Sequence, residues 1–246
     1  MNLLIDIGNS RLKWAFENDG LIGGVMAMDY RQPDFSDRLR QCWLGIAPPK
    51  KIAIAAVSAK AISSAVLELG ETLWPGIETV IPQSSSQAFG VSNAYDHPEK
   101  LGVDRWLAMI GAHRHYAGAL CVADCGTAIT FDVLHADGRH QGGLIAPGLA
   151  LMKKALVSNA ADLSFTAQSH QMQLATETNA AIANGVFLAA VGLIEQAMQA
   201  FSPEYQLILT GGDAEIVAEA LSISSAIDKE LVLKGLAVFG SGERAI

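Results

Sequence analysis

Short apolar runs separated by polar turns dominate the first half of the chain. Such runs are typical of covered strands, and apolar residues at three- and four-residue spacing indicate helices between them. The pattern predicts three strands, then helices alternating with strands, and a polar loop before the last helix of this half. The expected strands are 2–6, 11–16, 20–28, 51–57 and 77–81, the helices 35–44, 58–69 and 101–116, and the loop 82–96.

The same order of elements returns in the second half. Three strands come first, the last two joined by a tight turn at Asp137-Gly138, and helices and a strand then alternate. The expected strands are 120–124, 128–134, 140–146 and 206–210, and the helices 149–156, 178–200, 214–221 and 230–239. This repetition predicts an α/β fold of two similar domains. We place their boundary near Gly118, with residues 1–117 in one domain and 118–246 in the other.

A short motif also occurs twice, at corresponding places in the two halves. Ile5-Asp6-Ile7-Gly8-Asn9-Ser10 follows the first apolar run, and Ala123-Asp124-Cys125-Gly126-Thr127-Ala128 follows the run that opens the second half. A glycine there lets backbone N–H groups approach a phosphate, an Asp can hold a divalent cation, and a hydroxyl can donate a hydrogen bond. One Asp-x-Gly is an ordinary turn. Two copies in matching contexts favour a nucleotide cleft between the domains, as in a phosphotransferase.

Composition and charge narrow the class of protein. Half of the 246 residues are hydrophobic and 17% are charged, which argues against disorder. The net charge of −8 argues against a nucleic-acid partner, which would need a basic face. Asp6 interrupts the only early apolar run, and no stretch is long enough for a membrane span. The three cysteines lack metal-ligand spacing. We therefore expect a cytoplasmic protein with no membrane partner.

Three further segments carry candidate chemistry. Gly102-Val103-Asp104-Arg105 at a helix start places a possible carboxylate base beside a guanidinium suited to an anionic substrate, although a capping Asp and a surface Arg fit as well. The glycine-rich stretch 142–148 either lines the cleft or forms a turn. Thr210-Gly211-Gly212-Asp213 either approaches a nucleoside or is a simple βα loop. By themselves, Tyr95 and Thr178 indicate only structural roles.

Several common catalytic patterns do not occur in the sequence. It contains no Gly-x-x-x-x-Gly-Lys-Ser/Thr loop, no Gly-x-Ser-x-Gly elbow and no histidine spacing suited to zinc. Phosphoryl transfer by this chain would therefore depend on metal ions and backbone amides, with Lys13 as a nearby cation.

Taken together and in order, these motifs resemble those of a known family. The matching segments are Asp6-Ile-Gly-Asn-Ser-Arg-Leu-Lys13, Gly102-Val-Asp-Arg105, Asp124-Cys-Gly-Thr-Ala-Ile-Thr-Phe-Asp132, Gly142-Gly-Leu-Ile-Ala-Pro-Gly148 and Thr210-Gly-Gly-Asp213. Over its whole length the chain resembles type III pantothenate kinases, within the acetate and sugar kinase/Hsp70/actin superfamily. Ser10 is a small departure, since the family often has Thr there. The resemblance implies two RNase H-like domains, a duplicated actin-like ATPase fold, with a nucleotide cleft between them.

The resemblance also implies an activity and a set of roles. In the family, ATP phosphorylates the primary hydroxyl of pantothenate to give 4'-phosphopantothenate, the first step of coenzyme A synthesis. Asp104 would be the general base, Arg105 would bind the substrate carboxylate, and Asp124 would ligate a monovalent cation, K⁺ or NH₄⁺. Mg²⁺ would lie near Asp6. The remaining pantothenate-binding residues would be Tyr95, Gly102, Val103 and, across a homodimer interface, Thr178. The ATP-binding residues would be Asp6, Ile7, Gly8, Asn9, Ser10, Arg11, Leu12, Lys13 and Thr127.

Two alternatives stay open at this point. The chain could be another small-molecule kinase of the same superfamily, or a non-catalytic accessory factor of transcription, a label that family members have also carried. A binding-only descendant should have lost Asp104 or Asp124, and this chain retains both. No basic patch for DNA is evident in the sequence either.

Overall fold

The computed structural model describes residues 1–57, 60–158, 170–201 and 204–241, which form two compact units. The first unit contains Met1–His115 and Glu230–Ile246, and the second contains Tyr116–Lys229. The first change of unit lies within two residues of the predicted boundary. The assignment of the C-terminal segment differs from the prediction, because the last helix, α7 (Leu231–Gly240), packs in the first unit.

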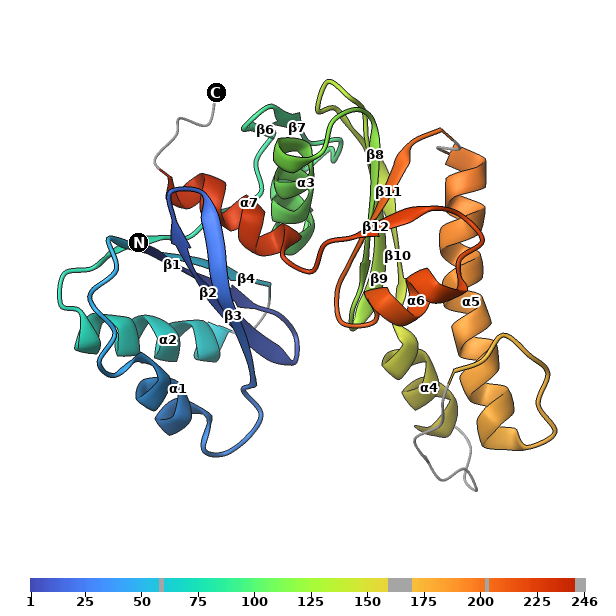
Figure 1. Cartoon of the computed structure of the whole chain (residues 1–246), viewed down its shortest axis with the longest axis horizontal. Coiled ribbons are helices and arrows are strands. Elements are labelled where there is room, and N and C mark those ends of the chain that lie inside the picture. Colours follow the sequence, from blue (N-terminus) through green and yellow to red (C-terminus); the bar gives the residue numbers. More distant parts are fainter. Residues whose placement is uncertain (58–59, 159–169, 202–203, 242–246) are drawn as a thin grey trace. The chain divides into compact units, whose positions relative to one another are not determined.

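A five-stranded sheet forms the centre of the first unit. Its strands stand in the order β3-β2-β1-β4-β5, with β1 antiparallel to β2 and parallel to β4. They are β1 (Asn2–Ile7), β2 (Arg11–Asn18), β3 (Leu21–Asp29), β4 (Lys51–Ala56) and β5 (Glu78–Val80). Helices α1 (Phe35–Trp43) and α2 (Lys60–Leu73) lie on one side of the sheet, and α3 (Val103–His115) and α7 on the other (Figure 1).

The alternation of side chains along β1 explains how both faces of this sheet are covered. Successive residues of a strand point to opposite faces. Leu3, Ile5 and Ile7 pack into the core beneath α1 and α2, whereas Leu4 faces α7. Asp6 shares the face of Leu4 and therefore points towards the side that carries α3 and α7. Those two helices can approach closely because Gly111 and Gly235 have no side chain at the contact. A Cβ on either glycine would collide with the backbone of the facing helix.

The second unit repeats this topology. Its sheet has the order β10-β9-β8-β11-β12, again with two antiparallel pairs followed by two parallel ones. The strands are β8 (Leu120–Cys125), β9 (Ala128–Leu134), β10 (His140–Pro147), β11 (Gln206–Thr210) and β12 (Ser225–Ile227), and the helices are α4 (Leu149–Ser158), α5 (Thr178–Phe201) and α6 (Ala214–Ala220). The matching strand order confirms the predicted α/β fold with two similar halves.

Most predicted elements are present, with three differences in detail. The expected loop 82–96 contains a short hairpin, β6 (Gln87–Ala88) and β7 (Val91–Ser92), and a one-turn helix follows at Pro98–Lys100. Strand β12 was not predicted. The first two residues of the helix expected at 58–69 lie outside the described residues, and α2 begins at Lys60.

Helix α5 is the one described helix whose length and composition would allow it to cross a membrane. Half of its most apolar stretch is buried, and residues such as Phe187, Ala190 and Ile194 pack into the core of the second unit. A long core helix passes the same test, so this helix is weak evidence for a membrane protein.

Candidate functional site

The first Asp-Gly turn lies at the carboxyl end of β1. Asp6 stands opposite Lys13 in the register of β1 and β2. Burial raises the pKa of the Asp6 carboxyl to about 6, the Lys13 ammonium opposes that shift, and the nearby Asp104 carboxylate adds to it. The sheet and the N-terminal turn of α3 thus bring together three of the predicted site residues.

The backbone of this turn is held by two hydrogen bonds. The Gly8 N–H donates to the Arg11 carbonyl at 3.0 Å, which closes the turn. The Tyr30 hydroxyl donates to the Gly8 carbonyl at 2.8 Å, reaching from the end of β3 across the neighbouring strand. Because C=O and N–H point in opposite directions in a trans peptide, Tyr30 fixes the direction of the next N–H, that of Asn9. Sequence reasoning missed Tyr30, since a lone Tyr 22 residues away carries no local signal.

The predicted phosphate-binding stretch 6–13 combines core and surface positions. The side chains of Ile7 and Leu12 are fully buried in the core, so these two residues could offer a ligand only their backbone. Asn9 and Arg11 are exposed, and Gly8, Ser10 and Lys13 are partly exposed. The stretch can therefore present backbone groups, one hydroxyl and two cations.

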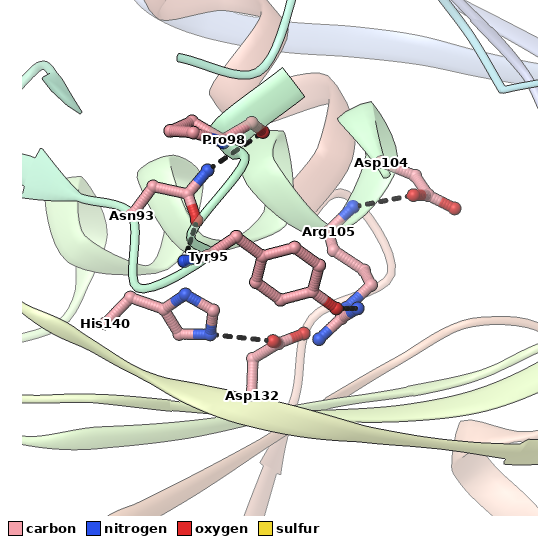
Figure 2. A network of polar contacts seen from close by, with 7 residues as sticks. All are labelled: Asn93, Tyr95, Pro98, Asp104, Arg105, Asp132 and His140. Carbon is pink, nitrogen blue, oxygen red and sulfur yellow. Dashed lines mark hydrogen bonds and ion pairs between the residues drawn. The ribbon is translucent and has the colours of Figure 1, made fainter. Parts of the chain in front are cut away.

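Tyr95, Asp104 and Arg105 lie side by side in the first unit (Figure 2). The Arg105 guanidinium is buried, with 6% of the residue exposed, and donates to the Tyr95 hydroxyl at 2.7 Å. Its central carbon also lies 5.6 Å from the centre of the Tyr95 ring, within cation–π range. The Asp104 carboxylate accepts the Arg105 backbone N–H at 2.8 Å at the start of α3.

The side chain of Asn93 sets the position of Tyr95. Its carbonyl oxygen accepts the Tyr95 backbone N–H at 3.0 Å, and its amide donates to the carbonyls of Ser85 and Pro98, each at 3.2 Å. This amide holds together the segment that the sequence predicted as a plain loop. Tyr95 and Arg105, both predicted to bind the substrate, are therefore held in contact by a network of hydrogen bonds.

The second Asp-Gly turn lies at the corresponding place in the second unit and is packed more tightly. Gly148, just before α4, donates its N–H to the Thr127 carbonyl at 2.9 Å. A Cβ on Gly148 would lie 2.0 Å from the Gly126 carbonyl oxygen, and one on Gly211, whose φ is +93°, would lie 2.3 Å from the Asp124 carboxylate. The two glycine-rich segments of the sequence analysis thus serve the packing around Asp124.

The remaining candidates occupy other places in the second unit. Thr178 is exposed at the first position of α5, beside Glu177, whose carboxylate accepts the N–H groups of residues 179 and 180. Residues 142–144 line a cavity of about 310 Å³ together with Phe131 and Phe201. Sequence reasoning also missed a buried pair in which His140 and Asp132 lie 3.0 Å apart (Figure 2).

Neither turn is a complete metal site by itself. Among the described residues, no group of three or more His, Cys, Asp or Glu could hold a metal ion. Mg²⁺ in phosphotransferases keeps several waters and is bound through one or two carboxylates plus substrate phosphates. A single carboxylate at the end of a strand, with a phosphate-accepting turn beside it, fits that kind of site.

The repeated sheet with a carboxylate at the end of each first strand is the fold of the actin-like ATPases and sugar kinases. Solved structures with the same fold include a Campylobacter jejuni protein described as a Baf family transcriptional activator (24% identity, 97% of each chain, TM-score 0.63). Another is the activator of 2-hydroxyisocaproyl-CoA dehydratase from Clostridium difficile (12% identity, 98% of this chain and 94% of that one, TM-score 0.54). At these identities the likeness shows the fold alone.

Comparison of sequences shows the family. The family model of type III pantothenate kinase matches residues 2–200. A type III pantothenate kinase of Nitrosococcus oceani is 36% identical over 247 residues, covering 96% of this chain and 92% of that protein. The chain belongs to the type III pantothenate kinase family.

Proposed function

We propose that this protein phosphorylates pantothenate with ATP to give 4'-phosphopantothenate, the first step of coenzyme A biosynthesis, in the cytoplasm. The match to the family over residues 2–200 carries this proposal. The site supports it, because Asp6, Lys13 and Asp104 interact within one unit. That arrangement joins a metal-binding carboxylate, a phosphate-binding cation and a base.

Asp104 acts as the general base. Its carboxylate accepts the proton of the primary hydroxyl of pantothenate as the oxygen attacks the γ-phosphorus, and the bond from that phosphorus to the β,γ-bridging oxygen breaks. The Arg105 guanidinium binds the carboxylate of pantothenate, and the hydrogen bond from Arg105 to Tyr95 restricts its orientation. A buried arginine loses little further entropy on binding, which favours a well-positioned substrate.

The turn after β1 binds the phosphates of ATP through residues 6–13, and Thr127 is a further ATP-binding residue of the proposal. Asp6 holds Mg²⁺, which offsets the negative charge of the transferring phosphoryl group when it is bound. Asp6 is suited to this role because its buried carboxylate gains a cation partner when metal and nucleotide bind. Asp124 binds K⁺ or NH₄⁺ at the second turn.

The assay that tests this function follows formation of phosphopantothenate from ATP and pantothenate in the presence of Mg²⁺ and K⁺. We expect turnover by the wild-type protein and a loss of about 10²–10⁴-fold in Asp104→Asn, the range for removal of a general base. The variant should keep its thermal stability and its affinity for pantothenate. Near-wild-type turnover in Asp104→Asn would refute the role of this residue.

The two alternatives predict different results in the same experiment. Another kinase of the superfamily would turn over a different small alcohol and leave pantothenate unchanged, which a panel of alcohols and hydroxy acids would reveal. A transcriptional accessory factor would show no ATP consumption with any of them. The Baf description of one structural neighbour belongs to a protein only 24% identical and is not evidence for that role here.

Homodimerisation is part of the proposal, with Thr178 contributing to the partner's pantothenate site. Mixing inactive Asp104→Asn and Thr178→Arg proteins tests it. If Thr178 serves the partner subunit, one site of each mixed dimer is intact, and complete exchange restores roughly a quarter of wild-type activity. If mixing restores nothing while mass spectrometry shows exchanged subunits, Thr178 serves its own subunit or lies outside the site.

A further inference from the structure

A buried lysine near the second Asp-Gly turn has no role in the function described so far. Lys153 lies on α4, the helix that begins directly after Gly148, and only 7% of the residue is exposed. Its neighbour Lys154 is exposed. A buried ammonium is costly unless charge and hydrogen bonds compensate it. The position of Lys153 therefore needs an explanation that the position of Lys154 does not.

Among the residues that the structure describes, the partners of the Lys153 ammonium compensate its charge only in part. Its Nζ contacts Nε2 of His170. An ammonium can only donate, so His170 accepts through Nε2 and is neutral in this contact. No carboxylate lies within ion-pair distance of Nζ among the described residues. One accepting nitrogen for three N–H donors leaves capacity for the oxygens of an anion.

Asp213 connects this lysine to the second turn. It follows Gly211-Gly212 at the end of β11, and its backbone N–H donates to the Cys125 carbonyl at 2.9 Å. Its carboxylate makes no capping hydrogen bond to α6. Burial raises the pKa of Asp213, and the basic groups His170 and Lys153 oppose that shift. Lys153 itself lies in the second turn of α4, the helix that begins directly after Gly148, whose N–H is bonded to the Thr127 carbonyl.

The charges around the turn indicate what the lysine does. Two carboxylates lie at the ends of neighbouring parallel strands, Asp124 in β8 and Asp213 just after β11, and the Asp213 N–H is bonded to the Cys125 carbonyl next to Asp124. A phosphate brought to the ends of β8 and β11 would be repelled by both carboxylates. Ligands of open α/β sheets bind at these strand ends. Lys153 supplies a fixed positive charge at this place, where the local sequence shows none.

We propose that Lys153 is a nucleotide-binding residue whose ammonium, held by His170, donates to a phosphate group of the bound nucleotide. The proposal rests on the proposed use of ATP as phosphate donor. It assigns a phosphate-binding cation to the second unit, which until now had none in the proposed function. Lys153 contributes to binding and is not assigned a step in the chemistry.

The test compares Lys153→Gln with Lys154→Gln, a matched control one residue along the same helix. Binding of ADP and of adenosine, each with Mg²⁺, is measured by calorimetry on the full-length protein. A hydrogen bond to a charged group is worth about 10- to 100-fold in affinity. We expect Lys153→Gln to weaken ADP binding by that factor and to leave adenosine binding unchanged, and Lys154→Gln to match the wild type for both ligands.

Each other outcome contradicts the proposal. Equal weakening of ADP and adenosine in Lys153→Gln would mean that the lysine only maintains the shape of the site. Unchanged ADP affinity in Lys153→Gln would mean that the lysine contacts no phosphate. If the wild type does not bind ADP at all, the protein has no nucleotide for Lys153 to contact, and the proposal is wrong. If Lys153→Gln does not fold, Lys153→Arg takes its place, and we expect it to bind ADP within a few-fold of wild type. If Lys153→Arg folds and binds adenosine like the wild type but loses more ADP affinity than that, the positive charge is not what binds the phosphate.

These results are separable from the proposed function. A wild-type protein that binds ADP but does not phosphorylate pantothenate would refute the kinase assignment, and the comparison of the two lysine variants would still decide the role of Lys153.

Discussion

The two Asp-Gly turns end equivalent strands of equivalent sheets, yet they are built differently. In the first, Asp6 stands opposite Lys13, whereas in the second, Asp124 stands opposite Thr130. A Cβ on Gly8 would meet nothing closer than the Arg11 carbonyl oxygen at 3.5 Å, and one on its counterpart Gly126 would meet Asp124 at 3.4 Å, but in the second unit a Cβ on Gly148 or Gly211 of the adjoining segments would collide with the turn. The first turn thus carries a local charge pair and free space. The second is enclosed by its neighbours.

This difference indicates that the two copies of the turn have different roles in the duplicated fold. Where the turn is open and charged, its residues can be used for metal and phosphate. Where it is enclosed, the glycines position the carboxylate, and compensating charge must come from elsewhere in the unit, as Lys153 illustrates. Substitutions of Asp6 and Asp124, and of the glycines that contact each turn, should therefore have unlike effects on stability and activity.

Among substitutions in the two turns, the largest effect is expected at Asp6. Removing its charge in Asp6→Asn should lower kcat/KM by about 10²–10³-fold, the usual cost of losing one electrostatic contact to the reacting group. The same change should stabilise the ligand-free protein at neutral pH, because an ionised carboxylate is no longer buried. Enzyme assays and thermal unfolding of the same preparation measure both effects. A variant that is both active and less stable would contradict the comparison.

The pH dependence of stability sharpens this prediction. The pKa of Asp6 is about 6 in the folded protein and 3.8 for an ordinary Asp. The folded state therefore holds a proton between these values that the unfolded chain releases, and this contribution to stability is lost as pH rises through 6. We expect the Tm advantage of Asp6→Asn over the wild type to be small near pH 4, to grow as pH rises to about 6, and to level off above about pH 7.

The second prediction contrasts the glycines of the two halves. Gly211→Ala should destabilise the protein by more than about 2 kcal/mol, because its φ of +93° and the facing carboxylate both exclude a side chain. Gly8→Ala should fold with nearly unchanged Tm, since the protein leaves room for its Cβ, and should weaken ATP binding because the phosphates need that space. Equal Tm losses in the two variants would remove the contrast.

The third prediction concerns the cation at the second turn. We expect activity to rise about tenfold or more when K⁺ is added to a sodium-only assay, the effect of about 1.4 kcal/mol of extra stabilisation. Asp124→Asn should lose this response together with much of its activity, whereas Asp213→Asn should keep it. A flat response of the wild type to K⁺ would refute the monovalent site.

The smallest effect is expected at Tyr30. Tyr30→Phe removes the hydrogen bond to the Gly8 carbonyl and should raise KM for ATP several-fold, with KM for pantothenate unchanged, since one neutral hydrogen bond contributes about 1 kcal/mol. Tyr116→Phe is the control, because it removes another tyrosine hydrogen bond, to the Asp228 carboxylate at 3.0 Å, in the second unit. If both variants change the two KM values alike, Tyr30 has no special relation to the turn.

The sequence by itself determined the local elements, the duplication and the family. Short apolar runs and helical spacing located the main strands and helices, and the repeated Asp-x-Gly motif marked equivalent strand ends, as the matching strand orders confirm. These features are readable because they depend on residues close together in the chain. The short strands β6, β7 and β12 were missed, since two or three residues carry too little pattern.

The tertiary structure alone decided which distant residues meet. It placed α7 in the first unit, Tyr30 on the Gly8 carbonyl, and Lys153 near Asp213. The placement of α7 depends on the close contact between Gly111 of α3 and Gly235 of α7, which the periodicity of the sequence does not reveal. The others join residues 22 and 60 positions apart in the chain. Such contacts depend on how strands and helices pack, and the charges that they bring together determine the chemistry of each turn.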